Sequence, residues 1–409
     1  MLYTFIFMGL GVLAPLIGAH LDQAGFTGDQ IGIITASGTF VAVFAAPFWG
    51  YRYASIESAS RRYYLVAAIF IAAALTALCL PGLRSFVIFL LAFILLYVFQ
   101  SPSVSLMDAL TIDVGEDFGL IRTFGALGFA LSCFSAAFLA DRTGTFVIFP
   151  IYAGCFLIGA AIVLLIRRSS GAAGKNEGSG AAVKAGKGNS AAEKSPAAER
   201  ISAAEDRASS PARGRQMYRQ LLSNRAYVLI VLCAFFINGT DNANNTYFNF
   251  LYLDGGGTLT GVGIAFLLMA GSEAPFMAAS TWLCQRFGQD RILLIAIVFS
   301  VVRFGLFSLG LPAPVLIALF PLQGLVNGIT LVEYVKYVAR VIPSELSGIG
   351  IAVYYAIGSS FSTIVCQLIG GHLLDHPLLT FSGPQSVYLF FAVFNIAGVL
   401  IFQFGCRRA

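Results

Sequence analysis

Three ionisable residues, Asp241, Glu273 and Arg303, fall near the middle of long apolar stretches of the sequence. A charge inside a lipid bilayer costs at least a few kcal/mol unless it is paired or faces water, so such residues are candidates for function. Arginine does not readily shed its proton, so Arg303 needs an anion, which is Glu273, Asp241 or an anionic solute. We therefore expect these three residues to couple transport to protons, with Glu273 as the first candidate for the carried proton. The alternative is a buried ion pair that serves structure alone.

A polar run in the seventh apolar stretch carries Asp241, Asn245 and Asn249 at positions i, i+4 and i+8. On a helix this spacing gives one polar stripe. The stripe is expected either to line a cavity or to form hydrogen bonds between helices, which amides also do in membranes.

The other candidates lie nearer the ends of their stretches. Asp108 and Arg122 are expected either to form a gating salt bridge or to bind a ligand. A substrate ring can stack on Phe129, Tyr354 or Tyr355, although aromatic residues at helical spacing also serve packing. Glu333 and Lys336 are i, i+3 neighbours, and Lys336 can extend its amine to the membrane surface.

Signs of other chemistry are weak. His372 and His376 have the spacing of metal ligands on a helix, but we expect no metal, and the seven cysteines lack such spacing. There is no glycine-rich, lysine-containing phosphate loop, and no nucleophile paired with a base. We therefore expect no cofactor and no enzyme activity. Glycine pairs, as at Gly370 and Gly371, predict close helix contacts.

The elements that carry these residues are predicted to be membrane helices. Of the residues 58% are hydrophobic and only 11% are charged, with a mean hydropathy of +0.82. A soluble chain could not cover such a surface. About 20 helical residues cross the hydrocarbon core, and the apolar runs are continuous, which excludes a β-barrel. The expected fold is an all-α membrane protein with twelve transmembrane helices, at residues 2–22, 29–50, 62–80, 85–110, 118–140, 145–166, 225–252, 259–283, 291–311, 313–338, 346–371 and 385–405.

A segment rich in Ala, Gly, Ser, Lys and Glu divides these helices into two sets of six. We expect two pseudo-symmetric six-helix bundles at 1–168 and 225–409, joined by a disordered cytoplasmic linker at 169–224. Of the 25 Lys and Arg residues, 22 fall on the side that holds both termini. This side is predicted to be cytoplasmic, in the inner or plasma membrane. The net charge of +5 suits an anionic membrane surface and does not signal nucleic acid.

The sequence resembles the major facilitator superfamily, in its branch of proton-coupled sugar permeases and phenylpropionate-permease-like proteins. The resemblance rests on residues 101–110, 117–128, 271–273, 285–288, 302–303 and 334–339. It implies two bundles that rock around a central site while a proton drives solute uptake. It also implies that Arg122 binds sugar, that Arg303 belongs to the coupling network, and that Asp241 serves structure more than coupling.

The departures from the sugar permeases concern the substrate. Phe129 stands where they stack a tryptophan, and Ser105 where they place a sugar-binding glutamate. Gln323 and Val326 stand where a histidine and a proton-carrying glutamate occur on helix ten. Galactoside recognition and that proton site are therefore not expected here.

The sequence predicts a monomeric, proton-coupled importer of a small organic solute such as an aromatic acid, a sugar or a nucleoside. Its expected partners are the solute, protons and membrane lipids. An anionic solute would bind Arg303 or Arg122, whereas a neutral one would use Asp108 and the asparagines of residues 242–249. The alternatives are a proton-antiport exporter and, from another class, a non-transporting receptor or assembly subunit.

Overall fold

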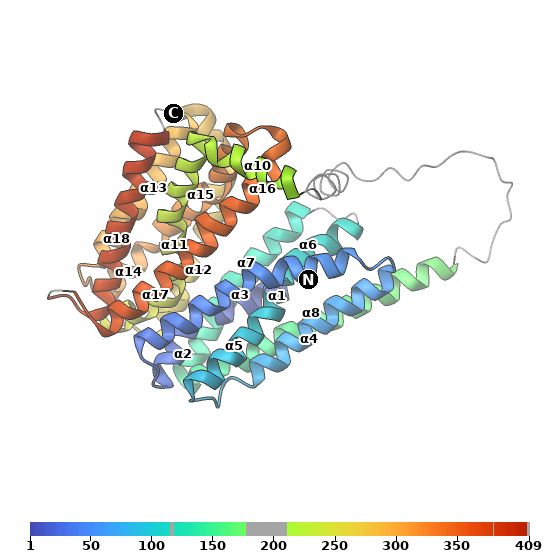
Figure 1. Ribbon diagram of the computed structural model, residues 1–409. Coiled ribbons are helices and arrows are strands. Elements are labelled where there is room, and N and C mark those ends of the chain that lie inside the picture. Colours follow the sequence, from blue (N-terminus) through green and yellow to red (C-terminus); the bar gives the residue numbers. More distant parts are fainter. Residues whose placement is uncertain (115–117, 177–210, 379, 407–409) are drawn as a thin grey trace.

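The protein is described by a computed structural model that is helical almost throughout and covers residues 1–114, 118–176, 211–378 and 380–406. The helices form two lobes (Figure 1). The N lobe contains α1 (Leu2–Leu13), α2 (Ile17–Gln23), α3 (Gly28–Ala54), α4 (Ala59–Leu78), α5 (Phe86–Gln100), α6 (Ser103–Val114), α7 (Phe118–Thr143), η1 (Thr145–Val147) and α8 (Ile148–Asn176).

The C lobe begins after the segment that separates the two sets of helices. It contains α10 (Pro211–Ser223), α11 (Arg225–Asp254), α12 (Leu259–Phe287), α13 (Gln289–Phe307), α14 (Ala313–Ala318), α15 (Phe320–Val341), η2 (Ser344–Leu346), α16 (Ser347–Val353), η3 (Tyr354–Phe361), α17 (Ser362–Asp375), α18 (Gly383–Ile401) and η4 (Phe402–Cys406). The short segments η3 and η4 are π-helical.

Eleven helical segments of the described chain are long and apolar enough to cross a membrane. The remaining predicted span, residues 291–311, corresponds to α13. This helix carries Asp290, Arg291 and Arg303 among its 19 residues, so it is more highly charged for its length than the other eleven. It nevertheless packs between α15 and α18 inside the C lobe. The chain is therefore an all-α, multi-pass membrane protein.

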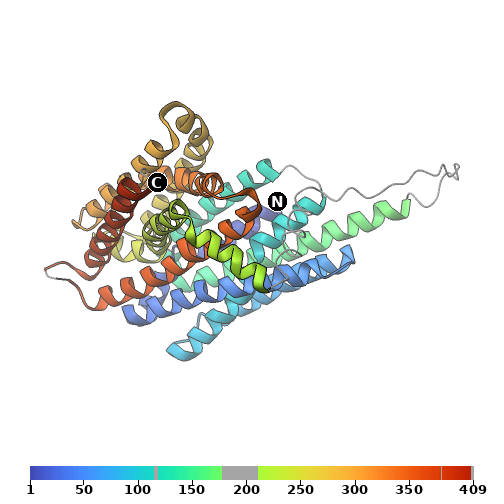
Figure 2. The ribbon, with the colours of Figure 1, turned by 45° about the horizontal axis from the view of Figure 1, so that its top comes forward.

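The ends of the predicted linker are helical. The last helix of the N lobe, α8, continues to Asn176, and Figures 1 and 2 show it beside α4, with which it packs. At the other end α10 packs on α11 and buries Leu221 in the C-lobe core. Residues 177–210 lie outside the described part of the chain. The amphipathic spacing of Met217 and Leu221, i and i+4, explains how this segment gains a packed face despite its charge.

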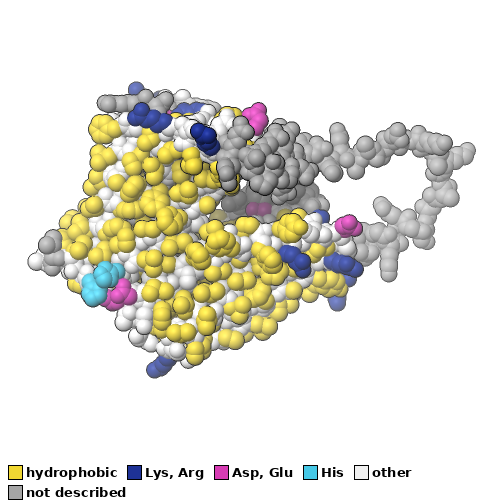
Figure 3. All heavy atoms as spheres, viewed as in Figure 1, with side chains coloured by type: hydrophobic (Ala, Val, Ile, Leu, Met, Phe, Trp, Pro, Cys, Tyr) yellow, Lys and Arg dark blue, Asp and Glu magenta, His cyan; other side chains and the backbone are white. Residues whose placement is uncertain are grey.

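Apolar side chains cover most of both lobes on the face that Figure 3 shows. Phe40, Leu91 and Phe404 are more than half exposed, as expected for side chains that meet lipid. Helix starts follow ordinary capping chemistry. Thr27 forms a capping box with Gln30 at the start of α3, which fixes where this helix begins.

The two lobes meet at one end, which we call the closed face. There α3 packs on α17, and α7 packs on α12. Asp375 accepts hydrogen bonds from the backbone N–H groups of Gly28 (2.8 Å) and Asp29 (2.9 Å). Deeper along the same pair of helices, the Thr35 hydroxyl donates to Gln367 at 2.9 Å.

At the opposite end, the open face, the lobes diverge in Figure 1, and Figure 3 shows a hollow between them. The chain's N-terminus and α10 lie toward this end. The arrangement thus has one sealed end and one accessible end, which is the geometry of one state of an alternating-access carrier.

Candidate functional site

A pocket of about 160 Å³ lies in the middle of the C lobe. Three of the elements that line it, α11, α12 and η3, also contact the N lobe, so the pocket lies near the centre of the molecule. Its lining is rich in amides, hydroxyls and carboxylates, from Asn238, Asp241, Asn242, Asn245, Glu273, Asn327, Thr330, Leu331, Tyr354, Tyr355 and Ser359. Such a lining suits a ligand with many hydrogen-bonding groups.

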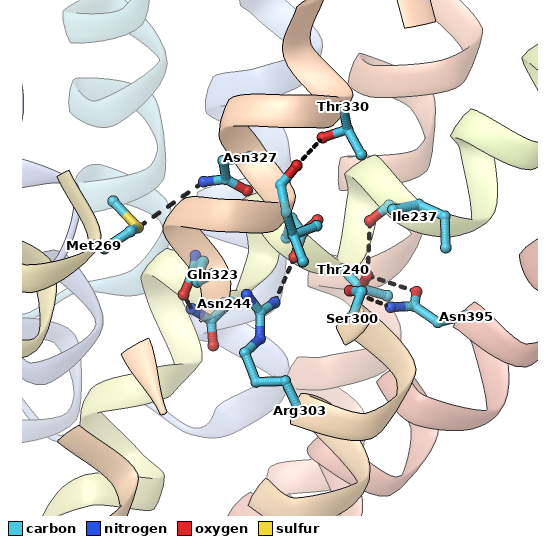
Figure 4. A network of polar contacts seen from close by, with 12 residues as sticks. Ile237, Thr240, Asn244, Met269, Ser300, Arg303, Gln323, Asn327, Thr330 and Asn395 are labelled. Atoms are coloured by element: carbon cyan, nitrogen blue, oxygen red, sulfur yellow. Dashed lines mark hydrogen bonds and ion pairs between the residues drawn. The ribbon is translucent and has the colours of Figure 1, made fainter. Parts of the chain in front are cut away.

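Arg303 lies behind the pocket and is paired with Asp241. The guanidinium Nη2 of Arg303 donates to Asp241 Oδ1 at 2.5 Å, and the Arg303 side chain is fully buried (Figure 4). Asp241 lines the pocket, whereas Arg303 does not. The structure therefore selects Asp241 among the three anions that the sequence left open for Arg303.

The Arg303 guanidinium is incompletely satisfied. Its Nε and Nη1 atoms are buried and have no hydrogen-bond partner within the described part of the chain. Its Cζ atom lies 4.2 Å from the centre of the Phe304 ring, a cation–π contact that offsets part of the missing hydrogen bonding. Asp241 is therefore the single hydrogen-bonding partner that the described residues offer this guanidinium.

Two further hydrogen-bond networks stiffen the helices around this pair (Figure 4). Asn244 donates to Gln323 at 3.0 Å and accepts from the Tyr388 hydroxyl at 2.7 Å. Thr240 donates to Asn395, which in turn donates to Ser300; both distances are 2.8 Å. These contacts join α11 to α13, α15 and α18, so the ion pair sits in a rigid frame.

Glu273 reaches the pocket from α12 and has no fixed cation. Among the residues that the structure describes, no Lys, Arg or His lies within ion-pair distance of its carboxylate, and Asn327 lies within hydrogen-bonding reach. Its neighbour Ser272 abuts Gly324, where any side chain would collide with α12. This close approach of α12 and α15 explains how Glu273 and Asn327 come together.

The predicted polar stripe is divided between two environments. Asp241 and Asn245 line the pocket. Asn249 is fully buried and lies outside it, beside Gly18 of the N lobe, and neither atom of its amide has a hydrogen-bond partner among the described residues. Each i+4 step turns about 40° around a helix, so the residue at i+8 faces about 80° away from the first. Asn249 is therefore an interface residue in this conformation.

The N-lobe candidates do not reach the pocket in this conformation. Asp108 accepts a hydrogen bond from the Tyr3 hydroxyl at 2.5 Å, within the N lobe. Phe129 packs against the C-lobe core at the boundary between the lobes. Arg122 is placed on α7, but its side chain lies outside the described residues, so its expected contact with Asp108 is not visible.

Toward the open face, Glu333 is tied into a local cluster. Its carboxylate accepts from Lys336 at 2.8 Å and from Gln289 at 3.0 Å, and Lys336 also donates to Thr281 at 2.9 Å. The Glu333 side chain is 1% exposed and that of Lys336 is 44% exposed, so this pair is structural and joins α12, α13 and α15.

Sequence reasoning missed several pocket residues. Asn327 and Thr330 are polar residues within an apolar helix, and that signal alone could have found them. Ser359 reaches the pocket from the π-helical segment η3, whose wider turn no residue pattern in the sequence announced. The same segment carries Tyr354 and Tyr355, which the sequence does offer as rings that could stack on a solute.

Comparisons with known proteins agree with this architecture. A family model described as the MFS_1 like family matches residues 1–382. The maltose permease of Geobacillus stearothermophilus is 31% identical over 412 residues, covering 99% of this chain and 93% of the relative. The uncharacterized transporter YwbF of Bacillus subtilis (strain 168) is 25% identical, covering 97% and 90%.

Solved structures show the same fold at low sequence identity. The nucleoside transporter NupG matches with a TM-score of 0.77 at 17% identity, over 98% of this chain and 96% of that chain. A bacterial homologue of the human lysosomal transporter Spinster matches with a TM-score of 0.70 at 12% identity, over 99% and 95%. The relatives are transporters and not enzymes. With its two six-helix lobes and its central polar pocket, the chain belongs to the MFS_1-like family and is a multi-pass membrane transporter of the major facilitator type.

Proposed function

We propose that the protein imports a neutral, hydroxyl-rich solute of the maltose class together with a proton. The observation that carries this proposal is the position of Asp241 between the pocket and Arg303. An anionic solute needs a cation in its site, and the buried guanidinium is covered by Asp241. Hydroxyl groups, by contrast, pair well with amides and carboxylates.

The similarity to a maltose permease over nearly the whole chain supports the same class of substrate. The pocket offers four asparagines as both donors and acceptors, and the rings of Tyr354 and Tyr355 as apolar faces. A sugar presents hydroxyls at its edge and C–H groups on its faces, so both kinds of lining find a partner. Phe129 and Asp108 complete the site from the N lobe when the lobes close around the solute.

Glu273 is the proposed carrier of the proton. Asp241 forms an ion pair with Arg303, whereas no described cation pairs with Glu273. A carboxylate without a fixed cation exchanges a proton with less structural cost than one inside an ion pair. Its protonated and ionised forms favour different contacts with α15, and this difference biases the two lobe arrangements.

The proposed orientation rests on the distribution of basic residues. Their excess on the side of both termini supports an open face at the cytoplasm, in the cell membrane, and a closed face outside. The chain works as a monomer in this scheme, since each chain contains a whole pocket.

The test is uptake of radiolabelled maltose by the full chain in proteoliposomes under an imposed pH gradient. External acid should drive accumulation above the equilibrium level. Glu273→Gln should abolish accumulation but leave solute exchange across the membrane intact, and Glu345→Gln, at an exposed site, should behave as the parent. Accumulation by Glu273→Gln would exclude Glu273 as the carrier, and exchange of solute against protons would establish an exporter instead.

A further inference from the structure

Three potential metal ligands meet on the closed face, away from the pocket. His372 and His376 lie one helical turn apart at the end of α17, and Asp29 lies in the first turn of α3. His372 Nδ1 is 3.2 Å from Asp29 Oδ1, and His376 Nε2 is 4.0 Å from Asp29 Oδ2. One nitrogen or oxygen of each residue lies within 4.8 Å of the others.

We propose that this cluster binds a divalent transition-metal ion such as Zn²⁺, and that the ion locks the lobes together at the closed face. Zn²⁺ takes imidazole nitrogen and carboxylate oxygen at about 2.0–2.2 Å in a tetrahedral arrangement. Ligand atoms in such a site lie about 3.3 Å apart, from that bond length. The observed separations reach this value with small side-chain rotations.

The backbone around the cluster is fixed. The Asp375 carboxylate accepts from the N–H groups of Gly28 and Asp29, so it holds the start of α3 against the end of α17. Side chains at Gly28 or Gly371 would collide with the facing helix, and their absence lets the two backbones touch. The ligand-bearing ends of both helices are thus held in register before any ion arrives.

The ligands are accessible to an ion from solvent. The side chains of Asp29, His372 and His376 are 46%, 59% and 63% exposed. A site with three protein ligands leaves the fourth position to water.

The consequence is that the site depends on the state of the carrier. Asp29 belongs to the N lobe and the histidines to the C lobe, so all three ligands meet only while the closed face is sealed. An ion that binds one state better shifts the equilibrium toward that state. Zn²⁺ outside the cell therefore acts as an inhibitor that holds the transporter closed on that side, whatever its solute.

The first test is isothermal titration of the purified, metal-free full chain with ZnCl₂. One Zn²⁺ should bind, and His372→Ala, His376→Ala and Asp29→Asn should each weaken binding at least 10-fold. Asp22→Asn, another exposed carboxylate of the closed face, should bind as the parent. Equal affinity in all variants would overturn the site. Loss of affinity in the histidine variants alone would overturn the bridge between the lobes, because the histidines would then bind without Asp29.

The second test measures locking directly. Thr35 is buried beneath the cluster, so the cysteine of a Thr35→Cys variant reacts with a maleimide only when the closed face opens. Its labelling is measured above that of the native cysteines, of which Cys79 is exposed. Zn²⁺ should slow this reaction at least fivefold relative to its rate in the same variant without Zn²⁺. The effect should vanish in Thr35→Cys combined with His376→Ala. An unchanged rate would overturn the locking role. Neither readout depends on the transported solute.

Discussion

Asp141 of the N lobe caps the first turn of a C-lobe helix through Thr260. Its carboxylate accepts from the Thr260 backbone N–H at 2.8 Å and from the Leu259 N–H at 3.0 Å. The same relationship recurs on the other side of the closed face, where Asp375 of α17 caps α3. Each lobe thus supplies one carboxylate to a helix N-terminus of the other lobe, where free N–H groups and the helix dipole favour an anion.

Loss of the Asp141 cap should favour opening of the closed face. A helix N-cap is worth about 1 kcal/mol, so Asp141→Ala should shift the equilibrium between the two lobe arrangements about fivefold. The measurement is the distance distribution between spin labels at Phe146 and Leu378, on opposite lobes of this face. Asp22→Asn should leave the distribution unchanged. A distribution in Asp141→Ala that matches the parent would show that the cap does not contribute to closure.

Bulk at the glycine contact should prevent closure. A Cβ on Gly371 would collide with the Gly28 carbonyl and lie 2.9 Å from Gly32 Cα, so Gly371→Val should separate α3 and α17. The distance distribution between the same spin labels should become broad and shift to longer distances, and uptake should be lost. Gly348→Val is the matched control, since no neighbouring atom of the described residues lies within 4 Å of where a Cβ would stand. Normal closure in Gly371→Val would contradict the close packing described for these helices.

Two adjacent asparagines should give opposite phenotypes. Asn244 is buried and bonded to Gln323 and Tyr388, so Asn244→Ala leaves both partners unpaired and should cost about 3 kcal/mol of stability. Asn245 lines the pocket, so Asn245→Ala should barely change stability but weaken solute binding about 10-fold, the worth of one hydrogen bond. Thermal unfolding in detergent and binding titration with maltose separate the two. Similar phenotypes for both variants would contradict the assignment of Asn245 to the site.

The Asp241–Arg303 pair should show strong coupling in a double-mutant cycle. Asp241→Asn leaves Arg303 buried without an anion, and removal of one partner of a buried ion pair costs about 3–5 kcal/mol. Arg303→Gln combined with Asp241→Asn removes both charges and should recover most of that loss. The measurement is thermal unfolding of the three variants and the parent. Additive effects would mean that the two side chains do not depend on each other in the membrane.

The membrane spans were predictable from the sequence because hydrocarbon demands about 20 continuous apolar residues for each helix. The expected close contact at Gly371 also agrees with the structure. The ends of the linker were less predictable, since α10 is stabilised by burial of Leu221 against the C lobe, a contact that the sequence does not reveal.

The pocket was only partly predictable. Asp241, Asn245 and Glu273 were expected to be functional because polar groups in lipid are costly, and all three line it. The different surroundings of Asn249 arise from the angular drift of an i+4 stripe together with the position of Gly18 on another lobe. Contacts between lobes depend on which face is closed, and a sequence that must support two arrangements does not specify one of them.

Every residue that lines the pocket comes from the C lobe. A solute bound there keeps its contacts with the C lobe, while the N lobe moves relative to it. The binding free energy of the solute is then nearly equal in the two lobe arrangements, apart from the contribution of N-lobe contacts. The carrier then avoids a deep free-energy minimum on either side of the membrane, and in the proposed symport the proton supplies only the work of moving the solute uphill.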